Sequence, residues 1–265
     1  MTPGESQGGT KEYWATLRAL RHQIEARRPL RDEVITLRAP ERDYHFALTL
    51  PAEDDRVLDE WVASLAEMAK PGAMARAAAD LHLPYWATPW ASGFALGEAV
   101  LANRSAFAGQ RVVELGCGLG TTAIATLVAG ADLTATDCFE EALDFCRFNT
   151  LRNTGRAPET LLVDWRTAEG RGRLIAGGPF NVALAADVLY DEEDVAPLLE
   201  LAPQLLAAGG ELWLADPGRD GATRFAAEAR RLGWSSHATE VDRDWPAGAG
   251  HARVVLYRFG HLRGS

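Results

Sequence analysis

The chain has 265 residues, of which 47% are hydrophobic and 24% charged, a composition typical of a globular protein and not of a disordered one. Its 37 acidic and 27 basic residues give a net charge of −10, which argues against nucleic acid or a membrane surface as a partner, because both attract a basic face. We find no apolar run of the ~18 residues that a membrane-spanning helix requires and no secretory leader pattern. The three cysteines have neither disulfide-framework nor metal-ligand spacing, so we expect no metal site and a reducing, cytoplasmic location.

The N-terminal third predicts a small extension ahead of a larger domain. Residues 1–10 are polar and glycine-rich and are expected to form a flexible tail. Apolar residues recur at helical spacing over 12–27 and again over 57–68, whereas 33–50 contains two runs with alternating hydrophobicity around a turn. We therefore predict an extension of helices and one hairpin over residues 11–82.

From residue 111 onward, strand-like and helical segments alternate, which indicates a parallel sheet covered by helices on both faces. The expected parallel strands are Arg111–Leu115, Ala131–Thr136, Glu159–Val163, Asn181–Ala186 and Gly210–Ala215. Two further runs, Trp234–Val241 and Ala252–Phe259, have no helix between them and are expected to close the sheet as an antiparallel hairpin. The prediction for residues 83–265 is an α/β fold with a Rossmann-like, seven-stranded sheet.

A glycine-rich turn follows the first of these strands and precedes the helical stretch Thr121–Ala129. Its sequence pattern is ExGxGxG, formed by Glu114, Gly116, Gly118 and Gly120. Glycine permits a positive φ and a close approach of the backbone to a ligand, and a helix N-terminus presents unpaired N–H groups. We expect the three glycines to contact a cofactor and the Glu114 carboxylate to fix the loop.

Two cofactors are compatible with a glycine turn at this place. A nicotinamide dinucleotide site has the pattern GxGxxG, but here the third glycine comes one position early and the acidic Glu114 is foreign to that motif. The pattern instead resembles motif I of the class I S-adenosylmethionine-dependent methyltransferases.

The residues at the ends of the next two strands agree with this resemblance. Asp137 lies 21 positions beyond Gly116, where a carboxylate can accept hydrogen bonds from both ribose hydroxyls; alternatively it caps the helix that begins near Phe139. Asp164 can accept from the adenine amino group while Trp165 covers an apolar ring face. The alternative for this pair is a core tryptophan beside a surface aspartate.

Two more segments narrow the family. Asp187-Val188-Leu189-Tyr190 follows the fourth strand, and residues 84–93 read PYWATPWASG. Together with motif I they resemble the DxxY-type, seven-strand protein lysine methyltransferases, most of all the branch that methylates the electron-transfer flavoprotein β-subunit. The resemblance covers about residues 83–216.

The resemblance implies roles for four further residues. Asp187 and Tyr190 would hold and orient the acceptor amine, Trp90 and Ala186 would contact the cofactor, and Trp90 with Tyr190 would form an aromatic wall. The alternative for Asp187 is a turn cap, and for Tyr190 a half-buried packing role.

The predicted activity is transfer of the sulfonium methyl of S-adenosylmethionine to a lysine amine of a protein partner. An amine with a pKa near ~10.4 must first lose its proton, and since the sequence shows no evident strong base, we expect the proton to leave to water. The alternatives are a small-molecule N- or O-methyltransferase, a non-catalytic cofactor-binding protein of the same fold and, less in keeping with the motif, a dinucleotide oxidoreductase.

Overall fold

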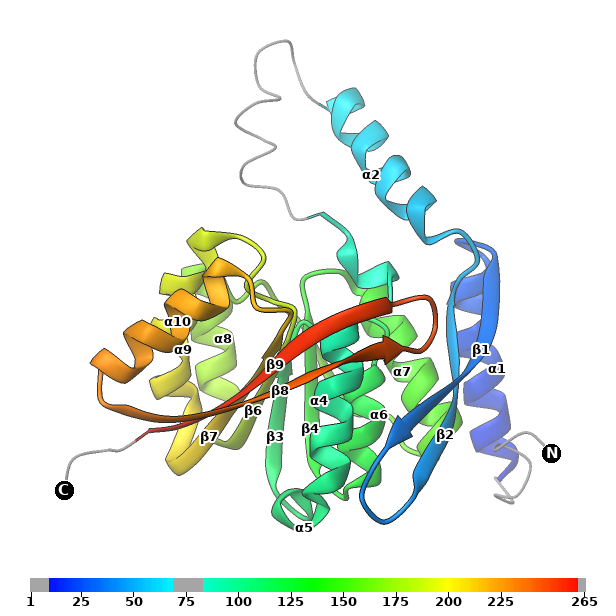
Figure 1. Ribbon diagram of the computed structural model, residues 1–265. Helices are drawn as coiled ribbons and strands as arrows, with labels where there is room; N and C mark the ends of the chain where they lie inside the picture. The colour runs from blue at the N-terminus through cyan, green and yellow to red at the C-terminus, as the bar shows by residue number, and fades with distance from the viewer. Residues whose placement is uncertain (1–9, 69–82, 262–265) are drawn as a thin grey trace.

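The computed structural model describes residues 10–68 and 83–261 (Figure 1). The predicted tail over residues 1–10 lies outside the described residues except for Thr10, whose side chain caps the first helix. None of the described helices is long and apolar enough to cross a membrane.

Seven strands of the described chain form one mixed sheet in the order β5-β4-β3-β6-β7-β9-β8. Their bounds are β3 Arg111–Leu115, β4 Asp132–Asp137, β5 Glu159–Leu162, β6 Phe180–Ala186, β7 Leu206–Asp216, β8 Trp234–Trp245 and β9 Gly250–His261. The strands β3 to β7 run parallel to one another, whereas β9 is antiparallel to both β7 and β8. The predicted seven-stranded, Rossmann-like sheet with a C-terminal antiparallel hairpin is therefore confirmed.

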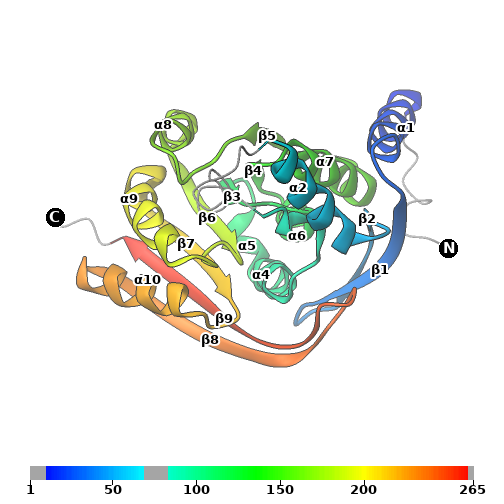
Figure 2. The same ribbon diagram turned by 90° about the horizontal axis from the view of Figure 1, so that it is seen from above.

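Helices cover both faces of this sheet (Figure 2). One face carries α4, α6 and α7, and the other carries α8, α9 and α10; alternate residues of each central strand contribute to two separate apolar cores. The helical elements of this domain are η1 Tyr85–Ala87, α4 Ala91–Ala102, α5 Arg104–Phe107, α6 Thr121–Val128, α7 Glu140–Thr154, α8 Ala168–Gly177, η2 Glu192–Asp194, α9 Val195–Leu205 and α10 Asp220–Arg231.

The N-terminal extension consists of α1 (Lys11–Glu25), the antiparallel pair β1 (Leu30–Arg38) and β2 (Asp43–Pro51), and α2 (Asp54–Met68). The helix α1 and strand β2 both contact α7, so the extension continues the helical layer on that side of the sheet (Figure 1). The hairpin agrees with the alternating pattern of the sequence.

Two asparagines on α7, one helical turn apart, attach the hairpin to the domain. The side chain of Asn149 accepts a hydrogen bond from Thr49 N (2.8 Å) and donates to the carbonyls of Thr49 (2.8 Å) and Leu119 (2.9 Å). Asn153 makes the equivalent pair of bonds with the backbone of Ala47. Each amide thus pairs with β2 as a neighbouring strand would, and Asn149 also links the hairpin to the glycine-rich turn.

Replacing Asn149 by leucine should lower the free energy of unfolding by about 3 kcal/mol, because three buried hydrogen bonds are lost and their backbone partners stay buried without replacement. Urea denaturation measures this. The matched control is Asn103→Leu, which removes a single bond to Ala99 O at the end of α4 and should cost about 1 kcal/mol or less. Equal losses in the two variants would contradict the anchoring role.

The last strands are longer than the sequence pattern indicates. The strands β8 and β9 each have 12 residues and curve around α4, where Arg243 forms an ion pair with Glu98 (Figure 2). Strand β7 begins at Leu206, four residues before the predicted Gly210. Gly209 consequently adopts its positive φ of 74° within β7, where a bulge next to β6 shifts the register.

Candidate active site

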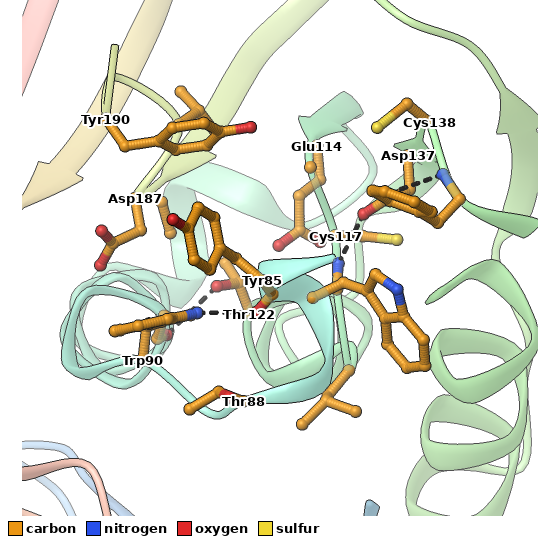
Figure 3. A pocket seen from close by; sticks show the side chains of 18 of the residues that line it. Tyr85, Thr88, Trp90, Glu114, Cys117, Thr122, Asp137, Cys138, Asp187 and Tyr190 are labelled. Atoms are coloured by element: carbon orange, nitrogen blue, oxygen red, sulfur yellow. Dashed lines mark hydrogen bonds between the residues drawn. The ribbon is translucent and has the colours of Figure 1, made fainter. Parts of the chain in front are cut away.

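A cavity, partly open to solvent, lies at the carboxyl ends of β3, β4 and β6 (Figure 3). The strand order reverses there, since β3 has β4 on one side and β6 on the other, and α/β proteins bind ligands at such a switch point. Ten of the eleven predicted site residues line it: Trp90, Glu114, Gly116, Gly118, Asp137, Asp164, Trp165, Ala186, Asp187 and Tyr190.

The glycines of the turn adopt conformations that other residues rarely take. Gly116 has φ +70° and Gly118 has φ +49°. A Cβ on Gly116 would lie 3.2 Å from Val188 Cγ1, and one on Gly118 would lie 3.5 Å from the carbonyl oxygen of Trp86. The positive φ favours glycine at both positions, and at Gly116 a tight contact with Val188 adds to this.

Gly120 is the predicted residue that the cavity lining does not include. It is the N-cap of α6 with φ +83°, and a Cβ there would lie 3.0 Å from the Cα of Cys146 on α7. The close approach of α6 and α7 at this point requires glycine, and contact of Gly120 with a cofactor stays a prediction.

Asp137 is buried at the end of β4, and its carboxylate organises two backbone segments. Oδ2 accepts a hydrogen bond from Gly118 N and Oδ1 accepts one from Phe139 N, both at 3.0 Å (Figure 3). Burial raises the pKa of this carboxyl to about 6, against the effect of these backbone donors. The bond to Phe139 is of the capping kind considered from the sequence, yet the same side chain also borders the cavity.

Glu114 is 2% exposed and lies in the floor of the cavity. Burial, reinforced by the nearby Asp137 and opposed by a hydrogen bond with Thr122, raises the pKa of Glu114 to about 8. Among the described residues, its Oε2 atom has no hydrogen-bond partner. A buried carboxyl oxygen without a partner indicates that the cavity accommodates a donor that the chain itself does not supply.

Asp164 and Trp165 follow β5 at the edge of the cavity. The Asp164 Oδ1 atom accepts a hydrogen bond from Arg166 N (3.0 Å), and burial raises the pKa of this carboxyl. Trp165 is buried in the apolar core that α8 and α9 share, as the packing alternative expects. The same residue also borders the cavity.

The side chains of Tyr85, Trp90 and Tyr190 lie on the opposite side of the cavity from Asp137, with Glu114 between them (Figure 3). The Tyr85 ring meets Tyr190 at 5.4 Å and Trp90 at 6.1 Å, nearly perpendicular to each. The Trp90 indole donates to the carbonyl of Tyr85 (2.8 Å), which fixes the loop before α4. Tyr85 is 36% and Trp90 39% exposed, so these two rings lie at the solvent-facing mouth.

Asp187 lies beside this aromatic group with an unusual backbone conformation, φ +61°, directly after β6. Its N–H donates to Ala215 O of β7 (2.9 Å), and its carboxylate forms an ion pair with Arg219. Burial raises the pKa of Asp187, and Arg219 and the Ser92 hydroxyl oppose that rise. Burial also raises the pKa of Tyr190, which keeps its hydroxyl protonated.

Sequence reasoning missed Tyr85 and Arg219. Tyr85 belongs to the PYW segment that the sequence analysis singled out, so its position was visible although its role was not. Arg219 lies 32 residues after Asp187, and only the adjacency of β6 and β7 brings the two together.

Solved structures of methyltransferase folds resemble this chain. A putative RNA methyltransferase from Pyrococcus horikoshii superposes with a TM-score of 0.52 and 16% sequence identity over 67% of this chain and 89% of that one. A precorrin-8w decarboxylase from Methanobacterium thermoautotrophicum gives a TM-score of 0.51 and 18% identity over 66% and 94% of the two chains. At these identities the likeness establishes the fold, which is the class I methyltransferase fold.

Residues 77–224 match the profile of a family described as lysine methyltransferases, and the chain belongs to that family. The electron transfer flavoprotein beta subunit lysine methyltransferase of Xenopus laevis is 33% identical over 138 residues, which are 51% of this chain and 53% of that protein. A ribosomal protein L11 methyltransferase from Hahella chejuensis is 32% identical over 141 residues, 52% and 43% of the two chains. The chain thus spans about half the length of the curated relatives it matches.

The cavity residues fit S-adenosylmethionine, the methyl donor of this fold class, on two counts. The unpartnered Glu114 oxygen suits a cofactor that carries an ammonium group and a sulfonium centre. Gly116 and Gly118 line the cavity beside the Asp137 carboxylate, where a backbone without side chains allows a ligand to approach closely.

Proposed function

We propose that the chain is an S-adenosylmethionine-dependent protein-lysine N-methyltransferase. The observation that carries this proposal is a single cavity with two ends of different chemistry. The buried carboxyl group of Asp137 lines one end, Asp187 with the rings of Tyr85, Trp90 and Tyr190 lines the other, and the Glu114 carboxyl lies between the two. Membership of a lysine methyltransferase family supports the same conclusion.

The cofactor end would be held by residues that follow β3, β4 and β5. Gly116 and Gly118 would border the bound molecule, Glu114 would meet its positive charge, Asp137 would accept from its ribose and Asp164 with Trp165 would meet its adenine. When bound, the cofactor supplies an activated methyl group on a sulfonium centre.

The acceptor end would align an amine with that methyl group. Asp187 supplies a hydrogen-bond acceptor, and Tyr190 supplies a protonated hydroxyl and a ring face. The rings of Tyr85, Trp90 and Tyr190 favour a methylated amine through cation–π attraction. No side chain at this end is an obvious base among the described residues, so the amine would lose its proton to water as it docks.

Incubation of the protein with radiolabelled S-adenosylmethionine tests this function. The acceptors are recombinant electron transfer flavoprotein β-subunit and ribosomal protein L11, chosen from the names of the two kinds of relative. We expect label on lysine side chains of the first, located by mass spectrometry. Label on L11 alone would redirect the substrate, and absence of label on these proteins and on total cell protein would contradict the proposal.

Asp187→Asn and Tyr190→Phe should each lower methyl transfer by about a hundredfold while affinity for S-adenosylmethionine stays within about threefold. The reason is geometric: both residues follow β6, whereas the proposed cofactor contacts are dominated by the ends of β3, β4 and β5. Activity and cofactor affinity are measured on the same samples.

The matched control is Asp191→Asn, an exposed carboxylate next to Tyr190, which should leave transfer unchanged. A packing role for Asp187 and Tyr190 predicts a different outcome, in which the melting temperature falls and activity follows the folded fraction.

We also propose a cytoplasmic location, with which three free thiols agree.

A further inference from the structure

Two carboxylates and one guanidinium form a cluster where β6 and β7 end. Arg219 Nη1 forms ion pairs with Asp187 and, at 3.2 Å, with Asp216. Asp216 is fully buried, and its Oδ1 atom also accepts from Gly218 N (2.8 Å) and Arg219 N (2.7 Å). The Asp216 carboxylate therefore shapes the turn that presents Arg219 to Asp187.

Helix stability does not explain an arginine at this position. Arg219 is the N-cap of α10, yet it has no side-chain acceptor for the helix N–H groups and makes no capping bond. A cation at a helix N-terminus is also unfavourable with respect to the helix dipole. The Arg219 side chain is stabilised instead by its ion pairs with two carboxylates.

The arginine acts on the site from behind Asp187. The Asp187 side chain is 9% exposed and borders the cavity, whereas Arg219, at 33% exposed, is absent from the cavity lining. An acceptor amine in the cavity would thus contact Asp187 directly. It would not contact Arg219, whose positive charge would act on the amine from behind the Asp187 carboxylate. A lone carboxylate at that point would stabilise the ammonium form of lysine, which cannot accept a methyl group.

We propose that Arg219 is a positioning residue that neutralises Asp187, so that the carboxylate accepts a hydrogen bond from an uncharged lysine amine instead of retaining it as an ammonium ion. The inference rests on the proposed lysine methylation. The ammonium proton leaves to solvent as the amine docks, and Asp187 then orients the N–H bonds of the amine.

The other groups that act on Asp187 are few among the described residues. Asp216 of β7 opposes Arg219 but is itself bound by the turn, and Ser92 of α4 contributes a neutral hydroxyl. Tyr190, three positions along its own segment, stays protonated over the working range. Arg219 is accordingly the group whose removal changes the charge that the docked amine experiences.

The test is the pH dependence of kcat/KM for methylation of recombinant electron transfer flavoprotein β-subunit by the full chain, measured for wild type, Arg219→Gln and Arg219→Lys. In Arg219→Gln the acidic limb of the profile should move up by roughly one pH unit, since a charge near the amine is removed. Activity at pH 7 should fall about tenfold and recover at high pH. Arg219→Lys keeps the charge and should keep the wild-type profile.

The control variant is Arg224→Gln, five residues later on α10, which removes an exposed ion pair with Glu192 and should not move the profile. An equal loss of activity by Arg219→Gln at every pH would overturn the inference, as would a downward shift. Calorimetric binding of S-adenosylmethionine verifies folding, and Arg219→Met replaces the glutamine variant if that one fails to bind. A wild-type protein that binds the cofactor but methylates no protein amine contradicts the proposed function itself, and the role of Arg219 with it.

Discussion

Replacing Asp137 by alanine should weaken binding of S-adenosylmethionine by roughly ten- to a hundredfold, which corresponds to about 1.5–3 kcal/mol for charge-assisted hydrogen bonds. The variant removes the proposed acceptor for the ribose hydroxyls. It also releases Gly118 N and Phe139 N, whose hydrogen bonds to the carboxylate hold the turn and the start of α7 beside the cavity. Isothermal titration calorimetry measures the affinity.

The matched control is Asp132→Ala, at the exposed beginning of the same strand, which should leave cofactor affinity unchanged. The melting temperature of the free Asp137→Ala protein separates binding from folding. An affinity within twofold of wild type, together with a lower melting temperature, would mean that Asp137 serves only to organise the backbone.

The parts of the site that follow from local sequence were predictable. A strand, a turn with glycines at alternate positions and a helix are specified within about 20 consecutive residues, and the structure has Gly116 and Gly118 at positive φ where the sequence analysis expected it. For Asp137, the structure shows the hydrogen bond from Phe139 N that the capping alternative expects, and the same side chain borders the cavity, where the ribose-binding role stays a prediction. A carboxylate has two oxygens, so one side chain can cap a helix and also face the cavity.

The parts that depend on strand order were not predictable. The pairing of Asp187 with Arg219 requires β6 and β7 to be neighbours and Asp187 to have a left-handed backbone, and neither follows from the residues near them. In the same way, the residues near Asn149 do not indicate its hydrogen-bond partners. Its physical role, pairing with the edge of β2 a hundred residues earlier, needs the tertiary structure.

Gly120 is a motif residue for which the structure adds a packing reason that the sequence does not indicate. The third glycine of the pattern is required, since its φ is +83° and a Cβ would collide with Cys146 on α7. A motif reflects all the constraints on a segment at once. A single sequence does not distinguish a glycine required for ligand contact from one required for contact between two helices.

Cofactor affinity should rise with pH from about 6 to 8 because Glu114 must ionise to receive a positively charged ligand. With a pKa of about 8, Glu114 is mostly protonated at pH 7 in the free protein. A bound ammonium or sulfonium favours the carboxylate form, so binding releases the proton. Affinity should gain up to about tenfold per pH unit below 8, and this gain should end above 8, where Glu114 is ionised and the cofactor amino group loses its proton.

The wild-type profile alone does not identify the group, since Asp137 titrates at about 6 and the cofactor amino group titrates near ~8. The difference in proton release on cofactor binding between wild type and Glu114→Gln isolates the contribution of Glu114. Calorimetry at pH 7 in two buffers of different ionisation enthalpy should show close to one more proton released by wild type than by Glu114→Gln. The control variant Glu159→Gln, an exposed glutamate at the start of β5, should behave as wild type.

Protein stability without cofactor provides an independent check with the opposite sign. The pKa of Glu114 is higher in the folded protein, about 8, than its ordinary value of 4.5, so between these values the folded state binds more protons than the unfolded one. The free energy of unfolding should therefore fall as pH rises from about 4.5 to 8, and Glu114→Gln should remove Glu114's share of that decline. S-adenosylmethionine should stabilise wild type increasingly over the same range, because the ligand compensates the charge that burial disfavours. Equal pH dependence of the cofactor-induced stabilisation in wild type and Glu114→Gln would place the cofactor's positive charge away from Glu114.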